Sequence, residues 1–159
     1  MEEISVSDRS TGVELAALFG HLVRLEIELW DRVDHRLRQD HDLPLSRFEP
    51  MEVMGRVPGC RVADIAQALS ITVGGTSKLV DRIEQSGWCR RTPNPGDARS
   101  SLLGLTRPGR RLLGAARRSF EDELERSLGV ALPPEHLASL STTLGAVRQR
   151  LADTPRATR

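Results

Sequence analysis

The chain has 159 residues, of which 38% are hydrophobic and 28% are charged, so its length and composition fit one globular domain or two small ones. No stretch reaches the roughly 18 consecutive apolar residues of a membrane span, and the first residues are acidic where a secretion signal is basic. We therefore expect a cytoplasmic protein without a membrane partner. Cys60 and Cys89 belong to no CxxC or paired-histidine motif, which excludes a disulfide framework and a zinc finger.

Positive charge is concentrated in the middle of the chain, although the net charge is only +1. Residues 1–60 hold 7 basic and 12 acidic residues, residues 61–118 hold 11 and 4, and residues 119–159 hold 5 and 6. A basic middle segment between acidic flanks predicts one face that can neutralise phosphates. An arginine-rich surface exposed to solvent gives the same count.

The first predicted element is a long helix from about Val13 to Asp40, where apolar residues recur at steps of three, four or seven. Its apolar stripe is too broad for one small core, so we expect it to be covered on more than one side. A second helix runs to about Arg56. Ser46 and Glu49 have the spacing of a capping box at its start.

Two short helices separated by residues 70–72 follow, which is the outline of a helix-turn-helix. The second of them is predicted at about 73–86 and ends before Gly87. Its expected core positions step by three and four residues: Val73, Thr76, Val80 and Ile83. Its remaining face then carries Gly74, Gly75, Ser77, Lys78, Asp81, Arg82 and Gln85.

Two adjacent glycines in a helix cost about 1 kcal/mol each relative to alanine. Either close approach of the backbone to DNA favours Gly74 and Gly75, or the first turn tolerates them. Ser77 and Lys78 lie near the same end, where a helix entering the major groove meets base edges and phosphates.

Residues 88–105 are predicted to form a β-hairpin with a long basic loop. Arg90, Arg91 and Arg99 flank this loop, and a thin finger that carries arginine fits a narrow minor groove. Asp97 lies two residues before Arg99, so we expect its carboxylate to orient the Arg99 guanidinium. An ordinary surface ion pair is the alternative.

The last third of the chain is predicted to be helical. Thr106 can cap a helix that runs through Leu128 and ends at Gly129, and another helix starts near Pro134. That last helix has a narrow apolar seam of the kind that two helices need to pack along each other. The seam consists of Leu137, Leu140, Leu144, Val147 and Leu151.

The stretch from Val62 to Gly109 resembles the winged helix-turn-helix of the MarR (multiple antibiotic resistance regulator) family. The similarity rests on V-A-D-I-A at residues 62–66, L-V-D-R-I-E at 79–84 with Gly87, and Asp97-x-Arg99 followed by Leu103, Leu105, Thr106 and Gly109. The resemblance implies a mainly α (α+β) fold, and a homodimer that binds a pseudopalindromic DNA operator. It also implies a repressor that a small-molecule effector or an oxidant releases.

The resemblance also implies a division of the chain and roles for its residues. Residues 12–43 and 130–152 would be dimerisation helices, 44–106 the DNA-binding domain with its wing at about 88–105, 107–129 a connecting helix, and 1–11 and 153–159 flexible tails. The DNA-binding residues would be Gly74, Gly75, Ser77, Lys78, Arg82, Arg90, Arg91, Asp97 and Arg99. The dimer contacts would be Leu15, Leu18, Leu22, Leu137, Leu140, Leu144, Val147 and Leu151. The residues that could line an effector site would be His21, Arg24, Trp30 and Phe48.

The sequence can be weighed against four alternatives. An enzyme is not indicated, because the sequence has no nucleophile motif, Gly-rich phosphate loop or carboxylate pair, and it calls for no cofactor. Asp31, His35 and His41 are the best candidates for a metal cluster, but they lack a further partner, so no metal site is predicted. Neighbouring arginines could lower the pKa of Cys89 or Cys60 and make a redox sensor. A winged helix that docks protein instead of DNA is the fourth alternative.

Overall fold

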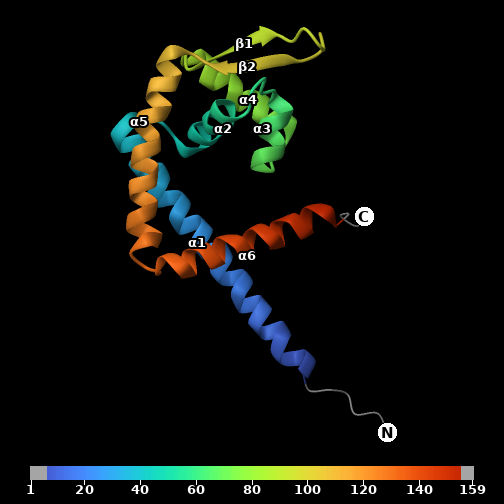
Figure 1. Ribbon diagram of the computed structural model, residues 1–159, viewed down its shortest axis with the longest axis vertical. Helices are drawn as coiled ribbons and strands as arrows, with labels where there is room; N and C mark the ends of the chain where they lie inside the picture. The colour runs from blue at the N-terminus through green and yellow to red at the C-terminus, as the bar shows by residue number, and fades with distance from the viewer. Residues whose placement is uncertain (1–6, 155–159) are drawn as a thin grey trace. The chain divides into compact units, whose positions relative to one another are not determined.

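The computed structural model describes the backbone of residues 7–154 and the side chains of residues 15–154. The elements in chain order are α1 (Ser7–His41), α2 (Leu45–Arg56), α3 (Val62–Leu69), α4 (Val73–Gln85), β1 (Cys89–Pro93), β2 (Ser101–Leu105), α5 (Arg107–Leu124), the π-helical turn η1 (Glu125–Gly129) and α6 (Pro134–Asp153) (Figure 1). The chain is thus mainly helical with one two-stranded sheet, as predicted. It forms two compact units, Met1–Phe120 and Glu121–Arg159.

The predicted element boundaries need small corrections at both ends. Helix α1 begins at Ser7, so the part of the predicted tail from Ser7 to Thr11 is helical, and α6 extends to Asp153. The remaining parts of the two predicted tails, residues 1–6 and 155–159, lie outside the described residues. None of the described helices is both long and apolar enough to cross a membrane.

The start of α2 is stabilised differently from the prediction. The helix begins at Leu45, one residue before the expected cap Ser46, and runs through Pro50. The backbone N–H of Leu45 donates to the Asp34 carboxylate of α1 at 2.8 Å. A carboxylate of α1 therefore satisfies one of the free N–H groups at the start of α2, where the sequence predicts a capping box of Ser46 and Glu49 instead.

The core of the first unit lies between α2, α3, α4, β2 and α5. Only the last part of α1 enters it, through Val33 and Leu37. The Phe48 ring of α2 stacks on Phe120 of α5, with centroids 4.9 Å apart. Further buried apolar residues of this core include Met51, Val53, Ile65, Val80, Ile83, Leu103, Leu105, Leu113 and Ala116.

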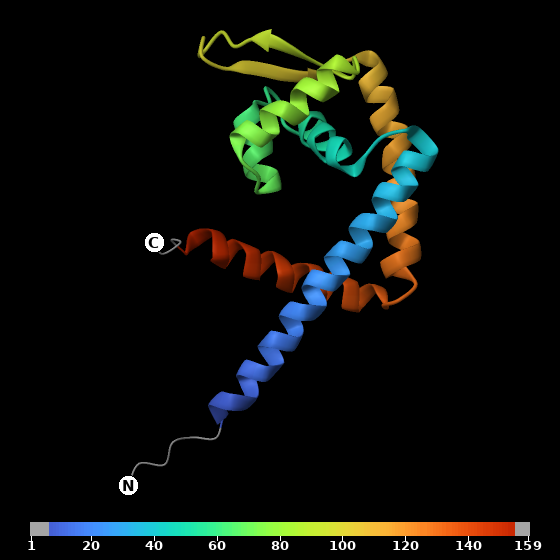
Figure 2. The same ribbon diagram turned by 180° about the vertical axis from the view of Figure 1, so that it is seen from behind.

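The wing is an antiparallel hairpin in which Cys89 pairs with Leu105 and Pro93 with Ser101. On its other edge, the N–H of Leu103 donates to the Cys60 carbonyl at 2.7 Å, which ties β2 to the segment before α3. The hairpin projects from the helices as a thin finger, and Figure 2 shows the same projection from behind. The predicted hairpin is confirmed, with residues 94–100 as its loop.

Thr106 and Gly109 lock the base of the wing. The Thr106 hydroxyl donates to the Gly87 carbonyl at 2.7 Å, the Thr106 N–H donates to the Trp88 carbonyl at 3.0 Å, and Thr106 Oγ1 accepts from the Gly109 N–H at 3.1 Å. A Cβ on Gly109 would lie 1.9 Å from the Trp88 carbonyl oxygen. The L-T-x-x-G motif therefore fixes the chain after α4 to the start of α5, and only glycine fits there.

The second unit consists of the end of α5, η1 and α6. The predicted helix through Leu128 is interrupted, because α5 ends at Leu124 and a π-helical turn follows it to Gly129. No residue of α6 is buried. Among the described residues, the apolar seam of this helix is therefore exposed, apart from the half-buried Leu137.

Candidate nucleic-acid interface

Helix α4 presents a polar face to solvent because its opposite side packs into the core. The Thr72 hydroxyl caps the helix by accepting the Gly75 N–H at 3.1 Å. Thr76, Val80 and Ile83 are completely buried. The residues on the other side are exposed, apart from the half-buried Ser77, and they are Gly74, Gly75, Lys78, Asp81, Arg82 and Gln85.

The two glycines of α4 have different surroundings. A Cβ on Gly75 would lie 3.0 Å from the Thr72 hydroxyl oxygen, so this glycine makes room for the cap. A Cβ on Gly74 would meet nothing within 4 Å. Local packing explains Gly75, whereas Gly74 leaves an open place on the exposed face where another molecule's surface can come close to the backbone.

One predicted core position of α4 is wrong. Val73 is 58% exposed instead of buried, although it continues the apolar spacing of Thr76, Val80 and Ile83. It is the first residue of the helix, and because side chains of a helix lean toward its N-terminus, this position lies beyond the end of the core.

The wing loop is shaped by side-chain hydrogen bonds to its own backbone. Asn94 Oδ1 accepts the Gly96 N–H at 3.0 Å, and the Asn94 amide donates to the Ser100 hydroxyl at 2.8 Å. Asp97 Oδ1 accepts the Arg99 N–H at 3.0 Å. These Asx-type bonds restrict the loop before any partner binds it.

The predicted role of Asp97 therefore needs correction. Its carboxylate holds the backbone of Arg99, and no ion pair joins it to the Arg99 guanidinium in the part of the chain that the structure describes. Arg99 is exposed at the loop. The local turn satisfies the carboxylate, which leaves the guanidinium available to a partner.

Arg91 is engaged with α4. Its guanidinium lies 2.6 Å from Asp81 Oδ1 and 3.7 Å from Glu84 Oε2, and the backbone N–H of Arg91 donates to Glu84 Oε1 at 2.8 Å. Arg91 therefore pairs with two carboxylates of α4 and links the wing to the helix. Arg90, its neighbour on the strand, is exposed.

Both cysteines are buried, and their microenvironment differs from that of a reactive thiol. Burial raises the pKa of Cys89 to about 11, and Glu84 adds to this more than Arg91 opposes it. Burial likewise raises the pKa of Cys60 to about 11, with Asp64 adding and Arg61 opposing. The expectation that neighbouring arginines lower these pKa values is wrong, because burial has the larger effect.

The four residues predicted for an effector site are not brought together around one cavity. Phe48 lies in the core, while His21, Arg24 and Trp30 are exposed along α1. Of the candidate metal residues, His41 is hydrogen-bonded through Nε2 to the Ser119 hydroxyl at 2.9 Å. Among the described residues no three His, Cys, Asp or Glu side chains form a group that could hold a metal.

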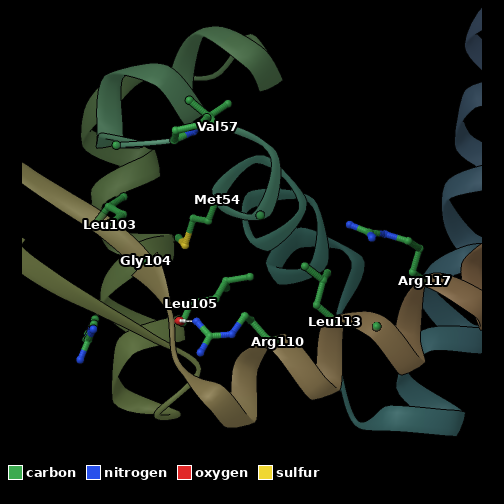
Figure 3. A pocket seen from close by; sticks show the side chains of 13 residues that line it. Met54, Val57, Leu103, Gly104, Leu105, Arg110, Leu113 and Arg117 are labelled. Atoms are coloured by element: carbon green, nitrogen blue, oxygen red, sulfur yellow. Dashed lines mark hydrogen bonds between the residues drawn. The ribbon is translucent and has the colours of Figure 1, made fainter.

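A cavity of about 510 Å³ lies elsewhere, between the end of α2, β2 and the start of α5 (Figure 3). Its labelled apolar residues include Met54, Leu105 and Leu113. The Arg110 guanidinium donates to the Leu105 carbonyl at 2.6 Å, and Arg117 pairs with Glu52 at 2.8 Å, so both arginines are already engaged. Sequence reasoning missed this cavity, because its residues come from three separate elements.

The predicted dimer contacts are on uncovered helix faces. In α1, Leu15, Leu18 and Leu22 are exposed to solvent, and in α6 the seam residues Leu140, Leu144, Val147 and Leu151 are exposed as well. Leu137 is half-buried. An apolar stripe of this extent is unusual on a free surface.

Comparisons with known proteins agree with this geometry. A family model described as MarR family matches residues 41–100. The HTH-type transcriptional regulator PecS of Dickeya dadantii is 29% identical over 146 residues, covering 89% of this chain and 86% of PecS. Sco3205, a MarR family transcriptional regulator from Streptomyces coelicolor solved in complex with DNA, superposes with a TM-score of 0.80 at 25% identity, covering 87% of this chain and 88% of that one. The transcriptional repressor CouR, bound to a 23-mer DNA duplex, gives 0.76 at 27% identity, covering 85% and 95%. Residues 41–100 therefore match the MarR family, and the chain resembles transcriptional regulators of this family in sequence and in fold.

Proposed function

We propose that the protein is a cytoplasmic repressor that binds a pseudopalindromic DNA operator as a homodimer and is released by a small-molecule effector. The observation that carries the proposal is the exposed face of α4 beside a wing with a free arginine. Both Sco3205 and CouR were solved bound to DNA, which supports the same partner for this chain. The protein then acts by binding, without catalysis.

In this proposal α4 is the recognition helix in the major groove. Lys78 and Arg82 are exposed and form no ion pair with the described residues, so their charges are available to phosphates and base edges. Asp81 would repel phosphates, but its pairing with Arg91 reduces this repulsion. We therefore assign Arg91 to the support of the helix, and keep Lys78 and Arg82 as direct contacts.

The wing supplies the second contact. Arg99 at its loop would enter the minor groove, where a narrow width concentrates negative potential. The hydrogen bond from the Arg99 N–H to Asp97 and the Asn94 bonds order the loop in advance, so less entropy is lost on binding. Arg90, exposed on β1, would lie near the phosphate backbone.

Dimerisation would place two recognition helices on one duplex. The exposed seams of α1 and α6 support this assembly, because a second copy offers the same apolar faces in a self-complementary arrangement. A two-fold protein matches a pseudopalindromic site with half-sites about one helical turn apart.

The effector would act by binding the dimer more tightly off DNA than on it, which shifts the population toward the free protein. His21, Arg24 and Trp30 stay predictions for its contacts. Phe48 is withdrawn from that set because its ring is buried against Phe120.

The test is a binding titration with DNA from around the protein's own gene and with a random duplex, at several salt concentrations. Arg99→Ala should weaken both complexes and lower the slope of log K against log salt by about one unit per subunit. Ser77→Ala should cost about 1–3 kcal/mol on the operator alone if the hydroxyl meets a base edge. Arg148→Ala on α6 is the matched control and should change neither.

Equal operator affinity of Arg99→Ala and the parent would rule out the wing contact. Absence of DNA binding by the parent in every buffer, with intact fold, would instead favour a module that docks protein.

A further inference from the structure

Two of the three large apolar side chains exposed between Leu45 and Leu105 lie at the entrance to α4. These are Ile71, in the turn before the helix, and Val73, its first residue; the third, Val57, lies at the end of α2. Val73 is the most exposed of the three, at 58%. The core of α4 is complete without it, because Thr76, Val80 and Ile83 are fully buried.

Val73 lies beside the residues that face DNA in the proposed function. It is four positions before Ser77, and residues at that spacing are neighbours on a helix surface. Gly74, which follows it, has no side chain and no neighbour within 4 Å of its missing Cβ. Side chains of a helix lean toward its N-terminus, so the Val73 methyl groups point toward the end that enters a groove first.

The floor of the major groove offers polar groups at every base pair and one apolar group, the C5-methyl of thymine. An exposed valine gains nothing from the polar groups, since they must be desolvated without a hydrogen bond. We propose that Val73 is a specificity-determining residue that contacts a thymine methyl group in each half-site. This proposal rests on the proposed function, because it requires α4 to read the major groove.

The experiment starts from duplexes that the parent protein selects from a random DNA library. Each thymine of the selected duplex is then replaced, one at a time, by deoxyuridine, which lacks only the methyl group. We expect one position per half-site at which the replacement weakens the parent about fourfold, the equivalent of burying one methyl group.

Val73→Ala should bind the unmodified duplex more weakly by a similar or larger factor, and should be insensitive to deoxyuridine at that same position. Such a cycle isolates the contact between the two groups. The variant should fold like the parent, since alanine is the better helix former at an exposed position. Val57→Ala is the matched control, an exposed valine of the same domain, and should keep the parent's deoxyuridine pattern.

The proposal is overturned if no replacement weakens the parent by more than twofold, or if Val73→Ala loses as much as the parent at every position. Both outcomes leave sequence-specific binding in place. If the parent enriches no duplex from the library, the proposed function fails, and the role of Val73 with it.

Discussion

Helices α4 and α6 have the same spacing of apolar residues, but these residues are buried in α4 and exposed in α6. In α4 the residues Thr76, Val80 and Ile83 are completely buried within the chain. In α6 the corresponding seam is exposed apart from the half-buried Leu137, from 37% at Leu144 to 70% at Leu151. Periodicity therefore predicts which face of a helix is apolar, whereas the partner that covers that face depends on the rest of the fold and on assembly.

The winged domain and the terminal helices therefore differ in whether their apolar residues are buried within the chain. The winged domain closes its own core, because five elements meet there and the Thr106 and Gly109 contacts lock the wing to the end of α4. The terminal helices leave leucines exposed to water. Each exposed leucine lacks about 1.5–3 kcal/mol of the stabilising free energy that full burial would give. A second copy of the chain can supply the missing cover.

Gly109→Ala should have the largest effect on stability, because it disturbs the winged domain, whose core is closed within the chain. The new Cβ would meet the Trp88 carbonyl oxygen, a backbone atom that cannot move without shifting the wing. We expect a loss of about 3 kcal/mol or more in the free energy of unfolding, measured by denaturant titration.

Gly114→Ala on the same helix is the matched control, because its Cβ would meet nothing within 4 Å. It should stabilise the protein by about 0.4–1 kcal/mol through helix propensity and reduced freedom of the unfolded chain. Equal stability of the two variants would show that the wing base tolerates displacement.

Leu144→Asp tests the open region. A carboxylate in the middle of the seam of α6 should cost several kcal/mol per dimer, because it replaces an apolar contact in each copy and must be desolvated. Light scattering at micromolar concentration should give a dimer for the parent and a monomer or aggregate for the variant. Gln149→Asp, on the opposite side of α6, should remain a dimer.

A monomeric mass for the parent would contradict this assignment of the seam. The winged domain should keep its thermal transition in Leu144→Asp, because its core is buried without any residue of the seam.

The local pattern was sufficient to predict most of the secondary structure. Helix periodicity, Gly87 after α4 and the turn residues of the loop at 94–100 each indicated the correct element. The start of α2 could not be predicted, since Leu45 is capped by Asp34 from another helix. Val73 was assigned to the core because spacing alone does not say where a core ends.

The sequence predicted which residues of the candidate site are exposed better than it predicted which partners they contact. The polar face of α4 follows from its apolar face, so Lys78 and Arg82 are exposed as expected. The engagement of Arg91 with Asp81 and Glu84 depends on how the hairpin lies against α4, which no spacing reveals. Asp97 binds the backbone of Arg99 for a similar reason, because the loop turns tightly between them.

Asp97 gives a prediction of intermediate size that distinguishes its turn from its charge. Asp97→Asn keeps an oxygen to accept the Arg99 N–H and removes a negative charge near DNA, so operator binding should be at least as tight as the parent's. Asp97→Ala loses the hydrogen bond and should weaken binding by about 1 kcal/mol, roughly fivefold. Weaker binding by both variants to the same extent would mean that the carboxylate charge itself is needed.

The smallest effect is expected at the two buried cysteines. With the pKa of each thiol at about 11, only about one thiol in ten thousand is ionised at pH 7, so both should react slowly with a disulfide reagent until the protein unfolds. Cys89→Ala should bind operator like the parent, before and after peroxide.

The ionisation of the two thiols should affect only the stability of the protein at high pH. Above the ordinary value of 9.0 the unfolded chain releases thiol protons that the folded chain retains up to about 11, so the parent should lose stability across this interval. The double variant Cys60→Ala and Cys89→Ala should lose less over the same range in denaturant titrations. Release of the parent from DNA by peroxide, with resistance in Cys89→Ala, would instead establish a redox switch.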